Sequence, residues 1–142
     1  MGASAFAIYN EAKKYLNNGT IDLDTNVIRA YLAKGSSNAS TYTLSTLAGV
    51  TNLVSGGGFK GHVKLTAVQV TTQGSAKQII FDSTAVIFSA SGANITSAKY
   101  LVLAVSAGKA IAWAKLSTTT FLITTGNKLT VTPPAAGWFT IN

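Results

Sequence analysis

Residues 97–105 read SAKYLVLAV, and this stretch is apolar on both faces near its centre. A strand with one face in water alternates apolar and polar residues, whereas a strand covered on both faces does not. The stretch therefore predicts the central strand of a buried sheet. By contrast, HVKLTAVQV at 62–70 alternates, so that Val63 and Leu65 share one face, which is typical of a strand with one covered side.

The residues on either side of these stretches extend the β pattern over most of the chain. Short runs of Val, Ile, Thr, Phe and Tyr are separated by Gly, Asn and Ser, which is the composition of strands and turns. This spacing predicts an all-β, antiparallel β-sandwich or barrel. The expected strands are 20–24, 27–33, 62–72, 77–82, 84–90, 99–106, 110–117, 120–125, 128–132 and 138–142.

Two segments depart from this pattern. The first, SAFAIYNEAKKYLNNG, predicts a short N-terminal helix within 1–18, with Ser4 as its N-cap and Asn18-Gly19 as its end. Its residues at helical spacing are Phe6, Tyr9, Lys13 and Leu16. The second, 34–61, is rich in Ser, Thr and Gly, and we expect a long loop or arm that orders only against a neighbour.

Length and composition predict one domain over residues 1–142. The chain is 47% hydrophobic, which is enough to fill a core, and it has no cysteine for a disulfide or a thiolate site. No export signal and no apolar run of about 20 residues is present, so we expect a protein made in a cytoplasm that does not enter a membrane.

The chain is basic because acidic residues are scarce. It has 11 Lys and Arg against 4 Asp and Glu, for a formal net charge of +7, and its lysines are scattered. Nucleic-acid sites usually cluster their cations and interleave aromatics, so we expect no nucleic-acid partner. A generally positive surface also fits docking on an acidic protein shell.

The candidate chemical groups favour a structural role. On a strand, Asp22 and Asp24 would share one polar face about 7 Å apart, without the differing surroundings that separate the roles of a catalytic pair. His62 has no G-x-S-x-G turn, and the glycine run at 56–58 lacks the spacing of a phosphate loop. We therefore expect no enzyme, no cofactor and no metal site.

Aromatic residues leave a binding alternative open. Trp113, Trp138, Phe121 and Phe139 could line a sugar site, although aromatic residues in strands more often belong to a core or an interface. A carbohydrate-binding β-sandwich that uses Trp113 or Trp138 is therefore one alternative function.

After the expected helix the chain reads LNNGTIDLDTNVIRAYL at 16–32, KQIIFDSTAVIFSASGANITSAKYLVLAV at 77–105 and TTGNKLTVTPPAAGWFTIN at 124–142. The order of these short phrases resembles a family of small virion proteins of tailed bacteriophages. Such proteins are commonly labelled head-decoration or cement proteins, and similar ones often adopt a jelly-roll-like β-sandwich. The segment at 40–61 departs from the resemblance, as does the scarcity of Asp. The matching positions are Gly19 to Asp24, Phe81-Asp82, Ile95-Thr96, Tyr100 to Leu103, Gly126-Asn127, Gly137 and Phe139 to Ile141.

This resemblance implies a capsid cement protein on the virion surface, assembled in the host cytoplasm. Its partner would be the major capsid protein, and copies of the chain would form a homo-oligomer, expected as a trimer that bridges neighbouring capsomers. A tail or connector subunit is the alternative within the virion. The expected contact residues are Phe6, Tyr9, Tyr15, Tyr42, Leu44, Phe59, Lys60, Trp138 and Phe139.

Overall fold

The computed structural model describes residues 6–55, 61–73, 78–106, 108–135 and 137–141. The stretch predicted to be a central strand belongs to β7 (Ile95–Val105), whose last five residues are all buried. The other elements, in chain order, are β1 (Ala7–Ile8), α1 (Asn10–Asn17), β2 (Ile28–Lys34), the 3-10 helix η1 (Leu47–Gly49), β3 (Val63–Lys64), β4 (Gln69–Gln73), β5 (Gln78–Asp82), β6 (Val86–Ser89), β8 (Ala110–Lys115), β9 (Phe121–Ile123), β10 (Lys128–Val131) and β11 (Phe139–Ile141).

These strands form three sheets, and every pairing between described strands is antiparallel. The main sheet has the order β1-β8-β7-β2-β3, and β9 pairs with the first part of β7. The smaller sheets are β10-β6 and β11-β5-β4. The prediction of an all-β chain with antiparallel sheets and one short helix is confirmed, and β7 is central as expected.

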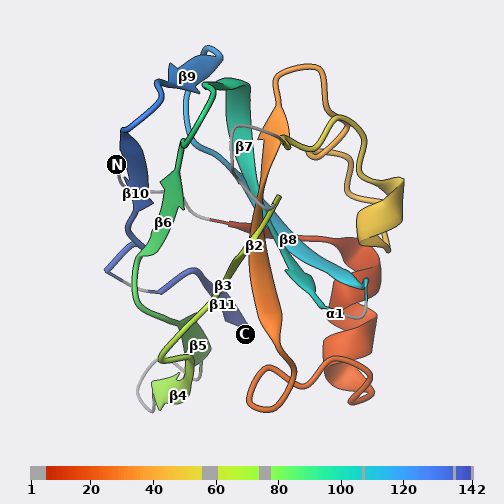
Figure 1. Ribbon diagram of the computed structural model, residues 1–142. Coiled ribbons are helices and arrows are strands. Elements are labelled where there is room, and N and C mark those ends of the chain that lie inside the picture. Colours follow the sequence, from red (N-terminus) through yellow and green to blue (C-terminus); the bar gives the residue numbers. More distant parts are fainter. Residues whose placement is uncertain (1–5, 56–60, 74–77, 107, 136, 142) are drawn as a thin grey trace.

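The main sheet is covered on both faces. In Figure 1 the two smaller sheets lie to the left of β2, β7 and β8, and α1 and η1 lie to the right. Paired residues such as Leu32 and Leu101 belong to one face, whereas Tyr31, Val102 and Trp113 belong to the other. Buried apolar residues from all three sheets form one core cluster. Burial on both faces explains why β7 is apolar on both faces.

The helix begins later than the sequence predicted. Ala7 and Ile8 form β1, which pairs with Trp113 and Ala112 of β8, so the chain is extended where a helix over 1–18 was expected. The helix starts at Asn10, after Tyr9, whose side chain makes no cap hydrogen bond. The predicted cap Ser4 lies outside the described residues. The helix end is as predicted, because Gly19 has a φ of +80°, a conformation that favours glycine.

The segment predicted as a long loop or arm is packed on the sheet over residues 35–55. Asn38 and Thr51 bond each other reciprocally, since each backbone N–H donates to the other's side-chain oxygen, at 3.1 and 2.8 Å. Ala39 and Val54 are buried, and the Ala110 N–H donates to the Ser45 carbonyl. The segment is a long loop whose one regular element is η1, which agrees with the loop alternative of the prediction, and these side-chain and backbone bonds hold it against the main sheet. Residues 56–60 lie outside the described part.

Two predicted strands also differ from the structure. Residues 21–26 form a turn, not a strand, between α1 and β2. The expected strand at 62–72 is split into β3 and β4, because Ala67 takes a φ of +51° that interrupts an extended chain.

Candidate functional site: a groove beneath the helix

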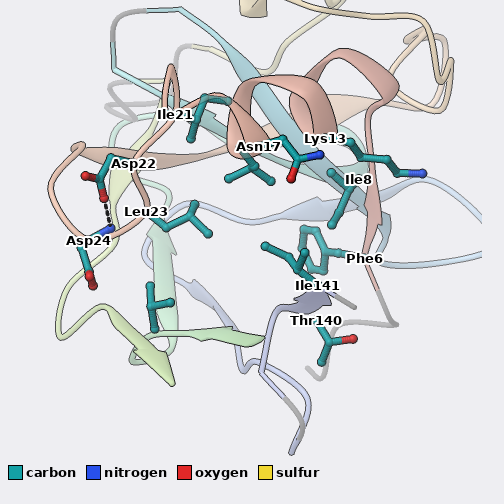
Figure 2. A pocket seen from close by; sticks show the side chains of 13 residues that line it. Phe6, Ile8, Lys13, Asn17, Ile21, Asp22, Leu23, Asp24, Thr140 and Ile141 are labelled. Carbon is teal, nitrogen blue, oxygen red and sulfur yellow. Dashed lines mark hydrogen bonds between the residues drawn. The ribbon is translucent and has the colours of Figure 1, made fainter. Parts of the chain in front are cut away.

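A groove of about 730 Å³ lies between α1, the turn at 21–26 and strands β1, β4 and β11. Figure 2 shows side chains from these elements converging on it. Its apolar floor is built by Phe6, Ile8, Leu16, Leu23, Val70 and Ile141. Its polar rim is built by Lys13, Asn17, Asp22, Asp24 and Thr140. An apolar floor with a few charged groups at the rim is the usual form of a binding site.

The helix supplies one wall of the groove. Lys13, Leu16 and Asn17 are three and four residues apart, so they share a helix face, and this face is turned to the groove. Leu16 is partly buried, whereas Lys13 and Asn17 are exposed. This wall therefore offers an apolar contact at Leu16 and a solvent-exposed cation at Lys13.

The opposite wall is the turn at 21–26, which is closed by its own polar groups. The Asp22 N–H donates to Asn26 Oδ1 at 2.8 Å, and Asp22 Oδ1 accepts the Asp24 N–H at 3.0 Å. The Asn26 N–H donates to the Asp22 carbonyl at 2.8 Å. These bonds form an Asx-type turn, and Asp24 contributes only its backbone N–H to them. The Asp24 carboxylate is therefore left for a partner.

The same turn separates apolar from acidic side chains. Ile21 is 2% exposed and Leu23 is 7% exposed, whereas Asp22 and Asp24 face solvent. The predicted separation of an apolar and a polar side is thus correct, although a turn and not a strand produces it. Figure 2 places the two carboxylates at one end of the groove and Lys13 at the other. The groove consequently has an acidic end and a basic end.

A second feature is an aromatic cluster on the far face of the main sheet, which we call the Trp113 cluster. The Trp113 ring meets Tyr42 at 6.3 Å and Tyr100 at 6.1 Å between centroids, both edge to face. Tyr42 is 53% exposed, and Lys99 Nζ lies 5.7 Å from the Tyr100 ring centroid. The Trp113 Nε1 is shielded from solvent and has no hydrogen-bond partner among the described groups.

Four of the nine residues that the sequence offered as contacts do not lie at the surface. Phe6, Tyr9, Trp138 and Phe139 are buried in the core, and the Phe6 ring meets Trp138 edge to face at 5.4 Å. Because their rings are buried in the core, Tyr9, Trp138 and Phe139 do not belong to a contact surface. Phe6 is also buried, but it forms part of the groove floor. The buried position of Trp138 also excludes it from a sugar site.

The remaining contact candidates divide into three kinds. Tyr15 is partly buried, with Lys109 Nζ at 4.4 Å from its ring centroid, and Leu44 is partly buried against the core. Tyr42 is exposed, as a contact residue should be. Phe59 and Lys60 lie outside the described residues.

Three exposed large apolar residues of the described chain, Val27, Ile87 and Leu122, escaped the sequence reasoning. Ile87 is 48% exposed on β6, and Leu122 is 54% exposed on β9. In VIFS (86–89) the alternation buries Val86 and Phe88 and turns Ile87 outward. The signal in the sequence was three apolar residues in a row at 86–88, because a strand with one covered face must turn at least one of them outward.

Clusters of metal-ligating side chains and membrane-spanning helices are absent from the described residues. In ranges 6–55, 61–73, 78–106, 108–135 and 137–141, no group of three or more His, Cys, Asp or Glu residues is placed to hold a metal ion. No helix in those ranges is long and apolar enough to span a membrane. His62 lies beside Tyr31, with ring centroids 5.7 Å apart.

No protein-family model, curated protein or solved structure matches this chain. The resemblance of its strand phrases to small virion proteins therefore stays an interpretation of the sequence. The function has to be argued from the surface, the charge and the groove.

Proposed function

We propose that this chain is a capsid cement protein of a tailed bacteriophage, built as a jelly-roll-like β-sandwich. It binds the outer shell, contacts the major capsid protein and stabilises the junctions between neighbouring capsomers. Copies act together as a trimer on the virion surface. The order of strand phrases along the chain supports this class, together with the surface features below.

The observation that carries the proposal is Leu122 on β9. This leucine is 54% exposed, and within the described chain β9 is hydrogen-bonded to β7 alone. A short strand with a free edge and an outward leucine can add backbone pairing and apolar contact to a partner surface. Away from the shell, both would remain unused.

The charge of the chain supports a shell as the partner. Eleven basic residues stand against four acidic ones, and Lys13, Lys64, Lys115 and Lys128 are exposed. A positive surface is attracted to an acidic protein shell, and this attraction speeds docking while apolar contacts give the bound state its lifetime. Several copies that bind together gain further affinity, because the second contact becomes intramolecular.

The test is co-sedimentation of the purified chain with heads of the tailed phage whose genome encodes it. We expect saturable binding that weakens as salt rises, and Leu122→Asp should abolish it. Thr43→Asp adds the same charge at an exposed position on the 35–55 segment and serves as the matched control. Absence of wild-type binding to heads, or equal loss in both variants, contradicts the proposal.

A glycan-binding role is the second candidate, and the Trp113 cluster favours it. Exposed Tyr42 beside Trp113 and Tyr100 offers aromatic surface of the kind that sugars stack on, with Lys99 near an acidic sugar. A glycan array read with the wild type and Tyr42→Ala tests this role. Hits that vanish with Tyr42→Ala support it, and an array without hits eliminates it.

A further inference from the structure

We infer that the groove beneath the helix receives a second copy of this chain, through the outward face of β6 and β10. In that contact Ile87 of one copy covers the apolar floor of the groove, and Lys128 meets Asp24 at its acidic end. The inference deepens the proposed function, on which it rests for the expectation of a trimer, by naming the two surfaces that join the copies.

The groove selects a partner that is apolar in the middle and basic at one end. Asp22 and Asp24 are two of only four acidic residues in the chain, and both lie at its rim. The Asp24 carboxylate takes no part in closing the turn at 21–26. A cation that reaches this end is attracted without competing with the fold.

The outward face of β6 and β10 has this composition. In the antiparallel register Ile87 opposes Thr130 and Ser89 opposes Lys128, so Ile87 and Lys128 are diagonal neighbours on one face. Diagonal side chains on a sheet are about 7–8 Å apart, close enough to act on one partner. Ile87, Ser89, Lys128 and Thr130 are all exposed, whereas the alternate residues Val86, Phe88, Leu129 and Val131 are buried.

Charge favours a copy of the same chain as the occupant. At +7, two copies repel each other overall, so an attractive contact between them needs an acidic group of one opposite a basic group of the other. The groove rim holds half of the acidic residues of the chain. The chain itself presents a matching surface, because exposed Lys128 lies beside exposed Ile87. The contact is thus complementary in both charge and polarity.

The contact joins different surfaces of the two copies. Figure 1 shows β6 and β10 on the opposite side of the molecule from α1, which forms a wall of the groove. An association of unlike surfaces closes into a ring if its rotation permits and otherwise continues as a filament. A ring of three copies is the form that fits the proposed three-fold cement.

The experiment is light scattering after size exclusion of the full chain, at several concentrations and at low and moderate salt. The wild type should show three times the 14.6 kDa chain mass. Asp24→Lys and Lys128→Asp should each raise the dissociation constant by about tenfold or more. Ile87→Ala should weaken the assembly, whereas Leu122→Ala, which removes an equally exposed apolar side chain elsewhere, should leave the mass unchanged.

The double variant Asp24→Lys with Lys128→Asp gives the sharpest result, because it exchanges the two charges and should restore the trimer. Circular dichroism of each variant checks that the fold is kept. A monomeric wild type, a trimer indifferent to these changes, or no rescue in the double variant overturns the inference. An open polymer would show that the contact continues as a filament, and this result overturns the closed ring of three copies. A monomer that still binds heads removes this inference and the trimer, and leaves the shell-binding part of the proposed function standing.

Discussion

The indole Nε1 of Trp138 donates a hydrogen bond to Ser83 Oγ at 2.8 Å, across 55 residues of sequence. Trp138 is fully buried, and its backbone N–H also donates to the Phe81 carbonyl at 2.8 Å. The other tryptophan, Trp113, is partly exposed and its Nε1 has no hydrogen-bond partner among the described groups. The two indoles therefore differ in both burial and bonding.

The first prediction compares these tryptophans. Trp138→Phe should lower the free energy of unfolding by about 2–3 kcal/mol, because it removes a hydrogen bond and leaves a cavity. Trp113→Phe should cost less than about 1 kcal/mol, because it removes a shielded donor that has no partner. Urea denaturation followed by circular dichroism measures both. Equal costs would contradict the assigned difference between the two sites.

The second prediction concerns Gly137, which precedes Trp138. Its φ is +84°, and an added Cβ would lie 2.6 Å from the Phe81 carbonyl oxygen. Gly137→Ala should therefore cost about 3 kcal/mol or more, because strain and a backbone clash act together. Gly19→Ala is the matched control, since Gly19 has a φ of +80° with nothing within 4 Å of an added Cβ. It should cost only about 1–2 kcal/mol, as thermal unfolding of both variants will measure.

The third prediction concerns Tyr9, whose hydroxyl donates to the Ala39 carbonyl at 2.5 Å in the core. Burial raises the pKa of Tyr9 well above its ordinary value of 10.0. Above pH 10 the unfolded chain releases this proton while the folded chain keeps it. The stability that this group contributes is thus complete below pH 10 and declines as the pH rises.

The check is the free energy of unfolding as a function of pH for the wild type and Tyr9→Phe. The variant should be less stable by about 1 kcal/mol at neutral pH, because it lacks the hydrogen bond. The difference should shrink above pH 10, because the variant has no proton to lose at this site. A difference that stays constant up to the most alkaline workable pH would show that Tyr9 titrates alike in both states.

The fourth prediction concerns the packed segment at 35–55. Asn38 Oδ1 accepts the Thr51 N–H, and Asn38 Nδ2 donates to the Gly49 carbonyl at 3.0 Å. Asn38→Ala should cost about 1–2 kcal/mol and speed hydrogen exchange at the Thr51 amide. The Val54 amide, which donates to the Leu32 carbonyl at 2.8 Å, should keep its slow exchange and is the internal control. Unchanged exchange at Thr51 would contradict this role for Asn38.

Regular alternation made the strands predictable from the sequence. The alternation in 128–131 and the double-sided apolar run in 97–105 each reflect how many faces of a strand are covered. The end of the helix could be predicted at Gly19, because the positive φ that often follows a helix is usually taken by glycine. The start of the helix could not be predicted, because Ala7 and Ile8 suit either a strand or a helix, and only their pairing with β8 decides between the two.

The candidate site was less predictable, because it depends on contacts between distant segments. The groove joins Lys13 on α1 to Val70 and Ile141, which no local pattern connects. Trp138 was expected at a contact surface, yet it packs in the core against Phe6, and its Nε1 bonds Ser83, which lies 55 residues earlier. In the same way, reciprocal bonding of Asn38 to Thr51 orders a segment that lacks any periodicity.

The most direct test of the cement proposal is the position of the chain on the virion. Gold-labelled antibody against the purified chain, applied to intact particles of the encoding phage, locates it by electron microscopy. The proposal predicts label over the whole head, with none along the tail. Label confined to the tail, or particles without label, would contradict it.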